Sequence, residues 1–154
     1  MGVVQERLLE MGIELPQLPK AVANYVPYVV SGNLVVVSGQ LPFDGEHLKF
    51  KGKVGTDYSL EEGQQAAQLC AMNILAQVRE ACNGDLDRVK RCLRLGGFVN
   101  CEPEFTKHPL VINGASDFMV KVFGEKGVHA RAAVGVNSLP LGVAVEVDAM
   151  FELG

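Results

Sequence analysis

The clearest pattern of hydrophobic and polar positions lies near the end of the chain. From position 143 to 152, alternate residues are apolar, and the residues between them include three carboxylates. A period of two is typical of a β-strand that buries one of its faces. The pattern therefore predicts a strand over Val143–Phe151, with Glu146 and Asp148 on its polar face.

Four earlier segments also have the composition of strands, because they are rich in valine and leucine and are bounded by turn residues. They are Val26–Val30, Asn33–Ser38, Val89–Asn100 and Arg131–Val136. Within the third of them, Gly96-Gly97 predicts a bulge, since glycine in a strand often marks one. The polar, glycine-containing stretch between the second and third segments predicts a loop or hairpin before the next helix.

Three segments show the period of amphipathic helices. The clearest runs from about Leu60 to Cys82 and repeats small apolar residues every three or four positions. Ser59 and Glu62 stand at capping-box spacing at its start. A short helix is predicted over Val3–Met11 and another over Pro109–Phe123.

This order of elements predicts a single α+β domain, in which two main helices pack on one face of a mixed sheet. The opposite face would then be left to solvent or to another subunit. The strand that carries Ala132, Val134 and Val136 is poorly suited to water on that side. We therefore expect a second copy of the chain to cover the face.

The amino-acid composition limits the kinds of partner that the chain is expected to bind. The chain has 154 residues, of which 48% are hydrophobic and 21% charged, and this is enough for one globular domain with its own core. A net charge of −4 offers no attraction to polyanions, so no nucleic-acid partner is expected. No apolar run approaches the roughly 20 residues that span a bilayer. We expect no membrane contact, a cytoplasmic location and four cysteines that stay as buried thiols.

Three side chains are the strongest candidates for chemistry. Arg131 begins a strand of small apolar residues, and a guanidinium grips a carboxylate through two hydrogen bonds. Glu146 or Asp148 would be suited to orienting or deprotonating a water. A structural ion pair for the arginine and a solvated strand face for the carboxylates remain open alternatives. The histidines are scattered and no metal or nucleotide motif is present, so no metal or other cofactor is expected.

Two blocks of sequence resemble one known family. NLVVVSGQLP at 33–42 is similar to the family's first long strand and its Ser-Gly-Gln-x-Pro turn. ARAAVGV at 130–136, Leu139-Pro140 and the strand over 143–149 are similar to its C-terminal signature. The chain thus resembles the Rid/YjgF family of reactive intermediate deaminases, also labelled endoribonuclease L-PSP, over roughly residues 25–152.

The resemblance implies a chorismate-mutase-like (YjgF-like) fold, a homotrimer with pockets between neighbouring subunits, and no cofactor. It also implies a family domain over residues 25–154, preceded by a helical extension over 1–24. In that family, the matching arginine, Arg131, holds the substrate carboxylate, and the matching glutamate, Glu146, positions water. The residues implied to line the rest of the pocket are Tyr25, Gly39 and Asn113.

The chain departs from the common family pattern at several positions. His129 stands where a proline is common, and Ala133 stands where many members have cysteine. These departures are typical of a divergent, chorismate-mutase-like branch. A chorismate mutase activity itself would rest on fold analogy alone.

The implied reaction is hydrolysis of 2-aminoacrylate and related imines or enamines to 2-keto acids and ammonia. A non-catalytic trimer that binds a small carboxylic acid is the alternative, and endoribonuclease activity is a less favoured third because no basic stripe is present. Arg131 fits the first two, whereas Glu146 favours the enzyme. Counting across the turn at 139–141, we expect Arg131 and Glu146 near the same end of one hairpin, with Asp148 farther from the arginine.

Overall fold

The computed structural model describes residues 2–18 and 26–154. The main sheet consists of β1 (Tyr28–Ser31), β2 (Leu34–Gln40), β5 (Val89–Asn100), β6 (Ala130–Val136) and β7 (Val145–Leu153). The helices are α1 (Val3–Glu10), α2 (Leu60–Ala81) and α3 (His108–Phe123), with short 3-10 turns η1 (Leu86–Arg88), η2 (Gly124–Gly127) and η3 (Pro140–Gly142). A separate hairpin is formed by β3 (Phe43–Asp44) and β4 (His47–Leu48).

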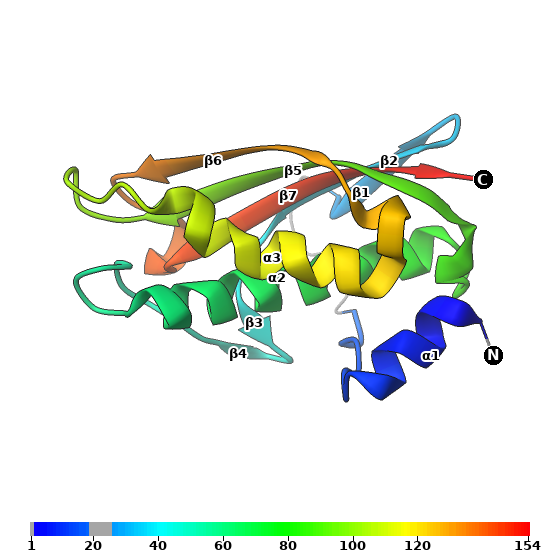
Figure 1. Cartoon of the computed structure of the whole chain (residues 1–154), viewed down its shortest axis with the longest axis horizontal. Helices are drawn as coiled ribbons and strands as arrows, with labels where there is room; N and C mark the ends of the chain where they lie inside the picture. The colour runs from blue at the N-terminus through cyan, green and yellow to red at the C-terminus, as the bar shows by residue number, and fades with distance from the viewer. Residues whose placement is uncertain (1, 19–25) are drawn as a thin grey trace.

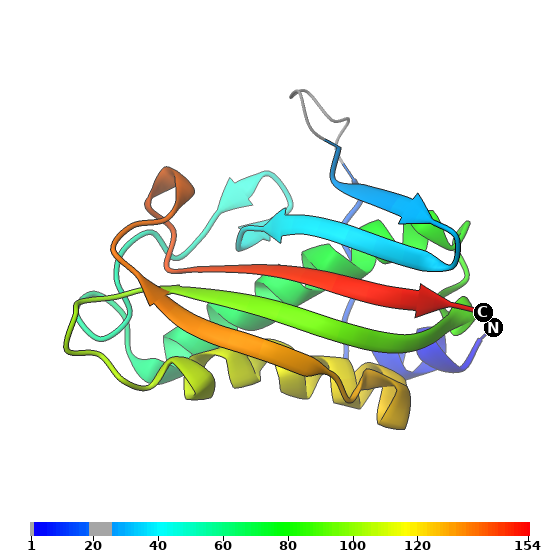
Figure 2. The ribbon, with the colours of Figure 1, turned by 90° about the horizontal axis from the view of Figure 1, so that it is seen from above.

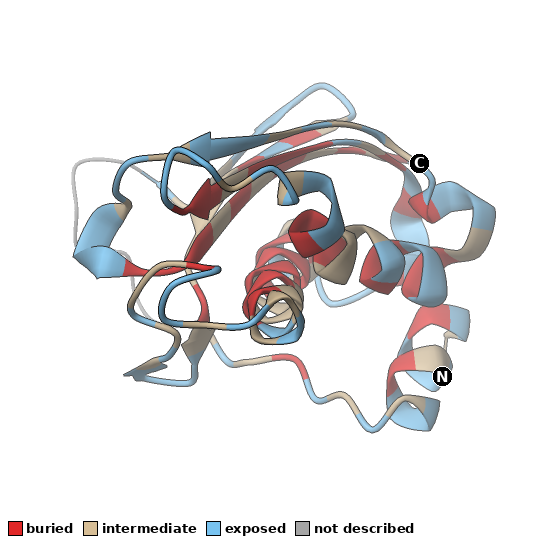
Figure 3. Cartoon of the chain, turned by 60° about the vertical axis from the view of Figure 1, so that its left-hand side comes forward, coloured by how far each residue is buried: buried red, intermediate tan, exposed pale blue. Residues whose placement is uncertain are grey.

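The architecture is the predicted α+β arrangement, in which α2 and α3 lie side by side on one face of a mixed sheet (Figure 1). Figure 3 shows that the buried residues gather between the sheet and these two helices. The predicted elements are all present, and their ends differ from prediction by at most two residues. No helix within residues 2–18 and 26–154 is both long and apolar enough to cross a membrane.

Helix α2 begins at the predicted capping box. The Ser59 hydroxyl accepts a hydrogen bond from the Glu62 backbone at 3.1 Å, and the Glu62 carboxylate accepts one from the Ser59 backbone at 3.0 Å. Small side chains such as Ala67 and Ala71 are fully buried along the helix. They let α2 approach both β7 and α3 closely, so α2 forms the centre of the core.

Glycines allow α3 to approach its neighbours. A Cβ at Gly97 on β5 would lie 2.5 Å from Ile112 Cγ1 on α3. The irregular positions in the pairing of β5 with β7 lie just before Arg91 and just before Arg94, not at Gly96-Gly97. The predicted bulge at Gly96-Gly97 is therefore wrong, because these glycines make room for side chains within a regular ladder.

The strand order differs from the hairpin expected for the last two strands. The spatial order is β1-β2-β7-β5-β6, so β5 lies between β6 and β7. β5 pairs with β6 in parallel, and β7 pairs antiparallel with both β2 and β5. The reason is the helix between β5 and β6, since a strand–helix–strand unit places its strands in parallel.

Helix α1 belongs to the same core. Val4 and Leu8 are buried with the residues of the main domain. The Asp87 carboxylate accepts hydrogen bonds from the backbones of Val3 and Val4, each at 3.0 Å. A carboxylate at a helix N-terminus satisfies free N–H groups and opposes the helix dipole, so α1 is fixed at its start.

No segment within the described residues covers the second face of the sheet. Figure 2 looks onto it and shows the five strands with the helices behind them. Val36 and Val134 on this face are 38% and 44% exposed, and Val29 on the edge strand is 50% exposed. A wide apolar face of this kind commonly marks an interface, and its coverage by another copy stays a prediction.

Gly114 provides a test of the contact between α2 and α3. A Cβ at this position would collide with the carbonyl of Gln64 on α2. We expect Gly114→Ala to lower the free energy of unfolding by about 1–3 kcal/mol through overpacking, although alanine is the better helix former by about 1 kcal/mol. Urea denaturation measures this change. Asp117→Ala, at an exposed position of α3, is the control, and a stabilised Gly114→Ala would contradict the close contact.

Candidate functional site

Arg131 faces the helices rather than the open side of the sheet. It lies beside Leu95 in the parallel ladder, and Leu95 is fully buried beneath the helices. Arg131 Nη1 donates to Asn113 Oδ1 at 2.8 Å and to Ser116 Oγ at 3.0 Å, and Nη2 donates to the Pro109 carbonyl at 3.2 Å. Helix α3 therefore holds the guanidinium on one side.

The guanidinium keeps donors for a ligand. A guanidinium has five N–H groups, and three are used in the contacts with α3, which leaves two within the described part of the chain. One of the two is Nε–H, because all three contacts come from the terminal nitrogens. Two free N–H groups are what a carboxylate needs for a two-point grip.

Glu146 lies on the opposite, uncovered face, where the alternation of β7 places it. Its carboxylate rests over the backbone of Gly39, and a Cβ at that position would occupy the place of Glu146 Oε2. Partial burial raises the pKa of Glu146, and repulsion from the Asp148 carboxylate raises it further. Glu146 is thus able to hold a proton at a higher pH than an ordinary glutamate.

Asp148 shares this face but has a different environment. Its Oδ1 lies 3.6 Å from Arg94 Nη1. Gly96 gives the carboxylate room, because a Cβ there would meet Asp148 Oδ1. Asp148 is therefore part of an ion pair, whereas no cation pairs with Glu146 among the described residues.

One chain does not bring Arg131 and Glu146 together. Arg131 lies level with Ala149 of β7, three positions from Glu146 along the ladder and two strands across. These offsets correspond to roughly 10 Å in each direction, and the two side chains lie on opposite faces. The expectation that one hairpin places them together is wrong, because β5 separates the strands. Asp148, expected to be farther from Arg131, is only one position away.

The other predicted residues divide between two places. Asn113 contacts Arg131, and Gly39 contacts Glu146. Tyr25 lies outside the described residues. On the edge strand β1, Tyr28 donates to Glu80 Oε1 at 3.3 Å, and partial burial and then the Glu80 charge raise its pKa. The chain thus carries two candidate half-sites: the guanidinium of Arg131, held by α3 beside β6, and the carboxylate of Glu146 on the outer face of β7.

Sequence reasoning missed Ser116 and His129. Both contact the group around Arg131, and Ser116 lies one helical turn after Asn113. Helical spacing was a usable signal, because residues three apart share a helix face. His129 was noted only as a departure from the family pattern.

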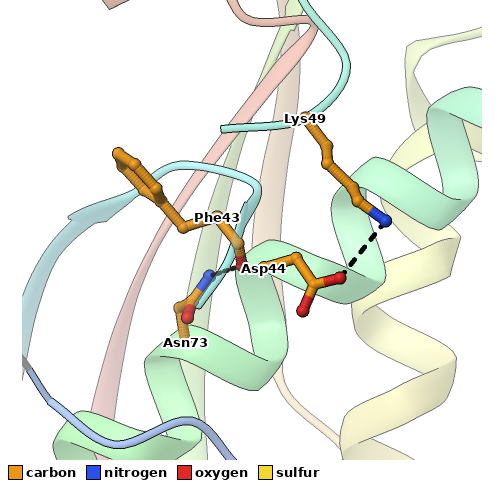
Figure 4. A network of polar contacts seen from close by, with 4 residues as sticks. All are labelled: Phe43, Asp44, Lys49 and Asn73. Carbon is orange, nitrogen blue, oxygen red and sulfur yellow. Dashed lines mark hydrogen bonds and ion pairs between the residues drawn. The ribbon is translucent and has the colours of Figure 1, made fainter. Parts of the chain in front are cut away.

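A cleft beside the β3–β4 hairpin and the four cysteines are weaker candidates. An open cleft of about 220 Å³ lies between the β3–β4 hairpin and α2. Figure 4 shows Lys49, which lines the cleft, 3.2 Å from Asp44, and nearby Asn73, which donates to the Phe43 carbonyl at 2.9 Å. Lys49 is the one cation among the described residues that line the cleft, and it is paired with Asp44.

The cysteines are buried and unpaired, as expected. Burial raises the pKa of Cys92 to about 12, and burial also raises the pKa of the Cys70 thiol well above its ordinary value. Such thiols are protonated at neutral pH and are poor nucleophiles. They therefore pack in the core and do not compete with the two half-sites as reactive groups.

Comparison with known proteins identifies the family. Residues 5–153 match the family described as "YjgF/chorismate mutase-like, putative endoribonuclease", and the chain belongs to this family. Protein TCP17 of Trypanosoma cruzi is 49% identical over 153 residues, which are 99% of this chain and 95% of TCP17. The match includes α1, so the family sequence extends over most of the chain.

Solved structures divide into closer and more distant neighbours. Atu1372 of Agrobacterium tumefaciens, of unknown function, is 51% identical with a TM-score of 0.92, over 99% of this chain and 94% of that one. A putative endoribonuclease of Shewanella oneidensis is 36% identical with a TM-score of 0.94, over 99% and 100%. RidA of an Antarctic Psychrobacter is 28% identical with a TM-score of 0.59, over 91% and 99%. The chain is therefore closer in structure to the first two than to RidA.

The raised pKa of Glu146 predicts a pH-dependent effect on stability. Burial and Asp148 act only in the folded chain, so the unfolded carboxyl ionises at lower pH. Above the raised pKa the ionised group opposes folding, and below the unfolded pKa it is protonated in both states and the effect disappears. We expect Glu146→Gln to raise the free energy of unfolding at neutral pH, with a gain that shrinks in acid.

Urea denaturation, carried out from neutral pH down into acid, measures this change in the free energy of unfolding. Asp148→Asn is the matched control, because it removes a carboxylate from the same face but breaks the contact with Arg94, and it should give no such gain. A gain for Glu146→Gln that persists unchanged in acid would show that shape, rather than charge, is responsible.

Proposed function

We propose that the protein hydrolyses imines or enamines that carry a carboxylate, in a site that two neighbouring copies of the chain form together. The observation that carries the proposal is the separation of Arg131 and Glu146 on opposite faces of one sheet. Each residue sits in a local environment suited to one part of the reaction. A small substrate can use both only where the outer face of one copy meets the β6 edge of another.

Arg131 would bind the substrate carboxylate. Its guanidinium is fixed by Asn113, Ser116 and Pro109 and retains two N–H donors. A fixed guanidinium loses little conformational freedom on binding, so more of the interaction energy becomes affinity. The reactive carbon would then lie next to the carboxylate, at a defined distance from the arginine.

Glu146 would position the attacking water and exchange protons with it. In the proposed reaction 2-aminoacrylate gains a proton on its terminal carbon and loses one from its nitrogen, which gives the imine. Water then adds across the carbon–nitrogen double bond, with its oxygen on the carbon and one proton on the nitrogen. As the carbon–nitrogen bond breaks, the hydroxyl proton moves to the nitrogen, and pyruvate and ammonia are released. A carboxylate with a raised pKa is suited to take a proton from water and return it to the leaving nitrogen.

A trimer is the assembly we propose, in keeping with the family resemblance. The uncovered sheet face carries exposed valines on three of its strands, Val29, Val36 and Val134. A permanent interface of this kind should bury on the order of 2,000 Å² or more. Contact through a closed ring would repeat the same shared site at each interface.

The second candidate function is binding without turnover. The anchored guanidinium of Arg131 supports carboxylate binding whether or not catalysis follows. The position of Glu146 beside Gly39, with a raised pKa, favours the enzyme. Release of ammonia from 2-aminoacrylate generated in the assay separates the two. Ribonuclease action is less favoured, because the net charge is −4.

Arg131 variants test the carboxylate site. Arg131→Lys keeps the charge but loses the planar fork, so it should weaken binding of pyruvate nearly as much as Arg131→Ala does. The loss should correspond to about 2–5 kcal/mol of binding free energy, measured by calorimetry. Parent-like binding of pyruvate by Arg131→Ala would exclude this residue as the carboxylate group.

Mixed oligomers test whether the site is shared. We expect Glu146→Gln to keep pyruvate binding and to lower deamination by roughly 10²–10⁴-fold. Oligomers that contain equal amounts of Glu146→Gln and Arg131→Ala chains should recover about a quarter of the parent rate, because a quarter of their interfaces pair two intact residues.

Each variant mixed with the double variant is the control, since no interface in such an oligomer holds both residues. Mass spectrometry establishes that the mixed assemblies form. No recovery in confirmed mixed oligomers would refute a shared site, and a monomer by light scattering at micromolar concentration would refute the assembly itself.

A further inference from the structure

A chain of polar contacts connects Arg131 to the backbone behind it. Ser116 Oγ lies 3.0 Å from Arg131 Nη1 and 2.9 Å from His129 Nε2. His129 Nδ1 lies 2.6 Å from the carbonyl oxygen of Gly127. The contacts run from η2 through the imidazole and the hydroxyl to the guanidinium.

When the His129 imidazole is neutral, the chemistry of the two ends fixes the direction of every hydrogen bond. A carbonyl only accepts, so His129 Nδ1 carries the hydrogen and Nε2 of the neutral ring is an acceptor. A guanidinium only donates, so Ser116 Oγ accepts from Arg131. The hydroxyl hydrogen of Ser116 is then directed to His129. All three contacts are satisfied at once by this one assignment for a neutral imidazole.

The Gly127 end of this series of polar contacts is held in a fixed position. Gly127 is buried against α3, and a Cβ there would collide with the carbonyl of Met119. Its carbonyl therefore has a fixed position relative to the helix that carries Ser116. His129 is held between these two points, and it holds the Ser116 hydroxyl with its acceptor side toward the arginine.

We infer that Ser116 and His129 are positioning residues, which hold the Arg131 guanidinium so that its two remaining N–H groups are ready for a carboxylate. The inference rests on the proposed function in one respect, that Arg131 binds the ligand carboxylate. Without the hydroxyl, Nη1 loses one of its two acceptors, and the side chain gains freedom that ligand binding must then remove.

The first test separates binding from turnover. Ser116→Ala removes the hydroxyl, and His129→Phe keeps a ring but removes its nitrogens. Each should raise KM for the imine and Kd for pyruvate about 10-fold, the effect of one hydrogen bond to a charged group, with kcat little changed. Ser116→Thr keeps a hydroxyl and should restore affinity to within about twofold. Asp117→Ala, an exposed neighbour on α3, should leave both constants unchanged.

The second test needs no ligand. Nuclear magnetic resonance of the guanidinium nitrogens reports rotation about the Cζ–Nη bonds of Arg131. In the parent protein, Nη1 is held by two acceptors and should give signals distinct from those of Nη2. In Ser116→Ala and His129→Phe, these signals should broaden and merge, whereas Ser116→Thr should keep them separate.

The outcomes distinguish the two proposals. If the parent binds pyruvate and Ser116→Ala binds it equally well, the positioning role is overturned. A fall in kcat at unchanged Kd would also overturn it, because the residues would then act in the chemical step. If the parent binds no 2-keto acid but the Arg131 signals merge in the variants, the positioning role stands and the proposed function fails.

Discussion

The parallel pairing of β5 with β6, with α3 as the crossover, determines where Arg131 and Glu146 lie relative to one another. Gly97 lets Ile112 of α3 rest directly on β5, so the helix lies over the β5–β6 pair rather than beside it. The inner face of β6 then points toward α3, and Arg131 reaches Asn113 and Ser116 on that helix. The same pairing leaves β7 on the other side of β5, where Glu146 points away from the helices.

This arrangement keeps the two candidate half-sites apart within one chain. A period of two along each strand assigns every residue to one face or the other, and no rotation of a side chain brings Arg131 through the sheet to Glu146. The apolar outer face supplies a reason for copies to associate, and association is also what would unite the two half-sites. Stability of the assembly and function would then depend on the same surface, so changes to the exposed valines would affect both.

Local patterns predicted the elements, whereas the pairing of strands depended on contacts distant in sequence. The capping box at Ser59 and the alternation in β7 act within a few residues, and both predictions are confirmed. The order of β5, β6 and β7 depends instead on the crossover helix, and a simple count across the turn at 139–141 placed β6 beside the wrong strand. The family resemblance implied Arg131 and Asn113 as pocket residues without predicting their contact, and the contact of His129 with Ser116 depends on the packing of α3 on β6.

Glu146 and Asp148, two of the three carboxylates of β7, show how the local environment gives similar residues different properties. Glu146 and Asp148 share a strand face and each rests on a glycine of a neighbouring strand. Asp148 lies beside the Arg94 guanidinium. Glu146 has no such cation among the described residues, and partial burial and then the negative charge of Asp148 both raise its pKa. A group that exchanges protons with substrate needs a pKa closer to neutrality than an ordinary carboxyl has, and the surroundings of Glu146 move its pKa in that direction.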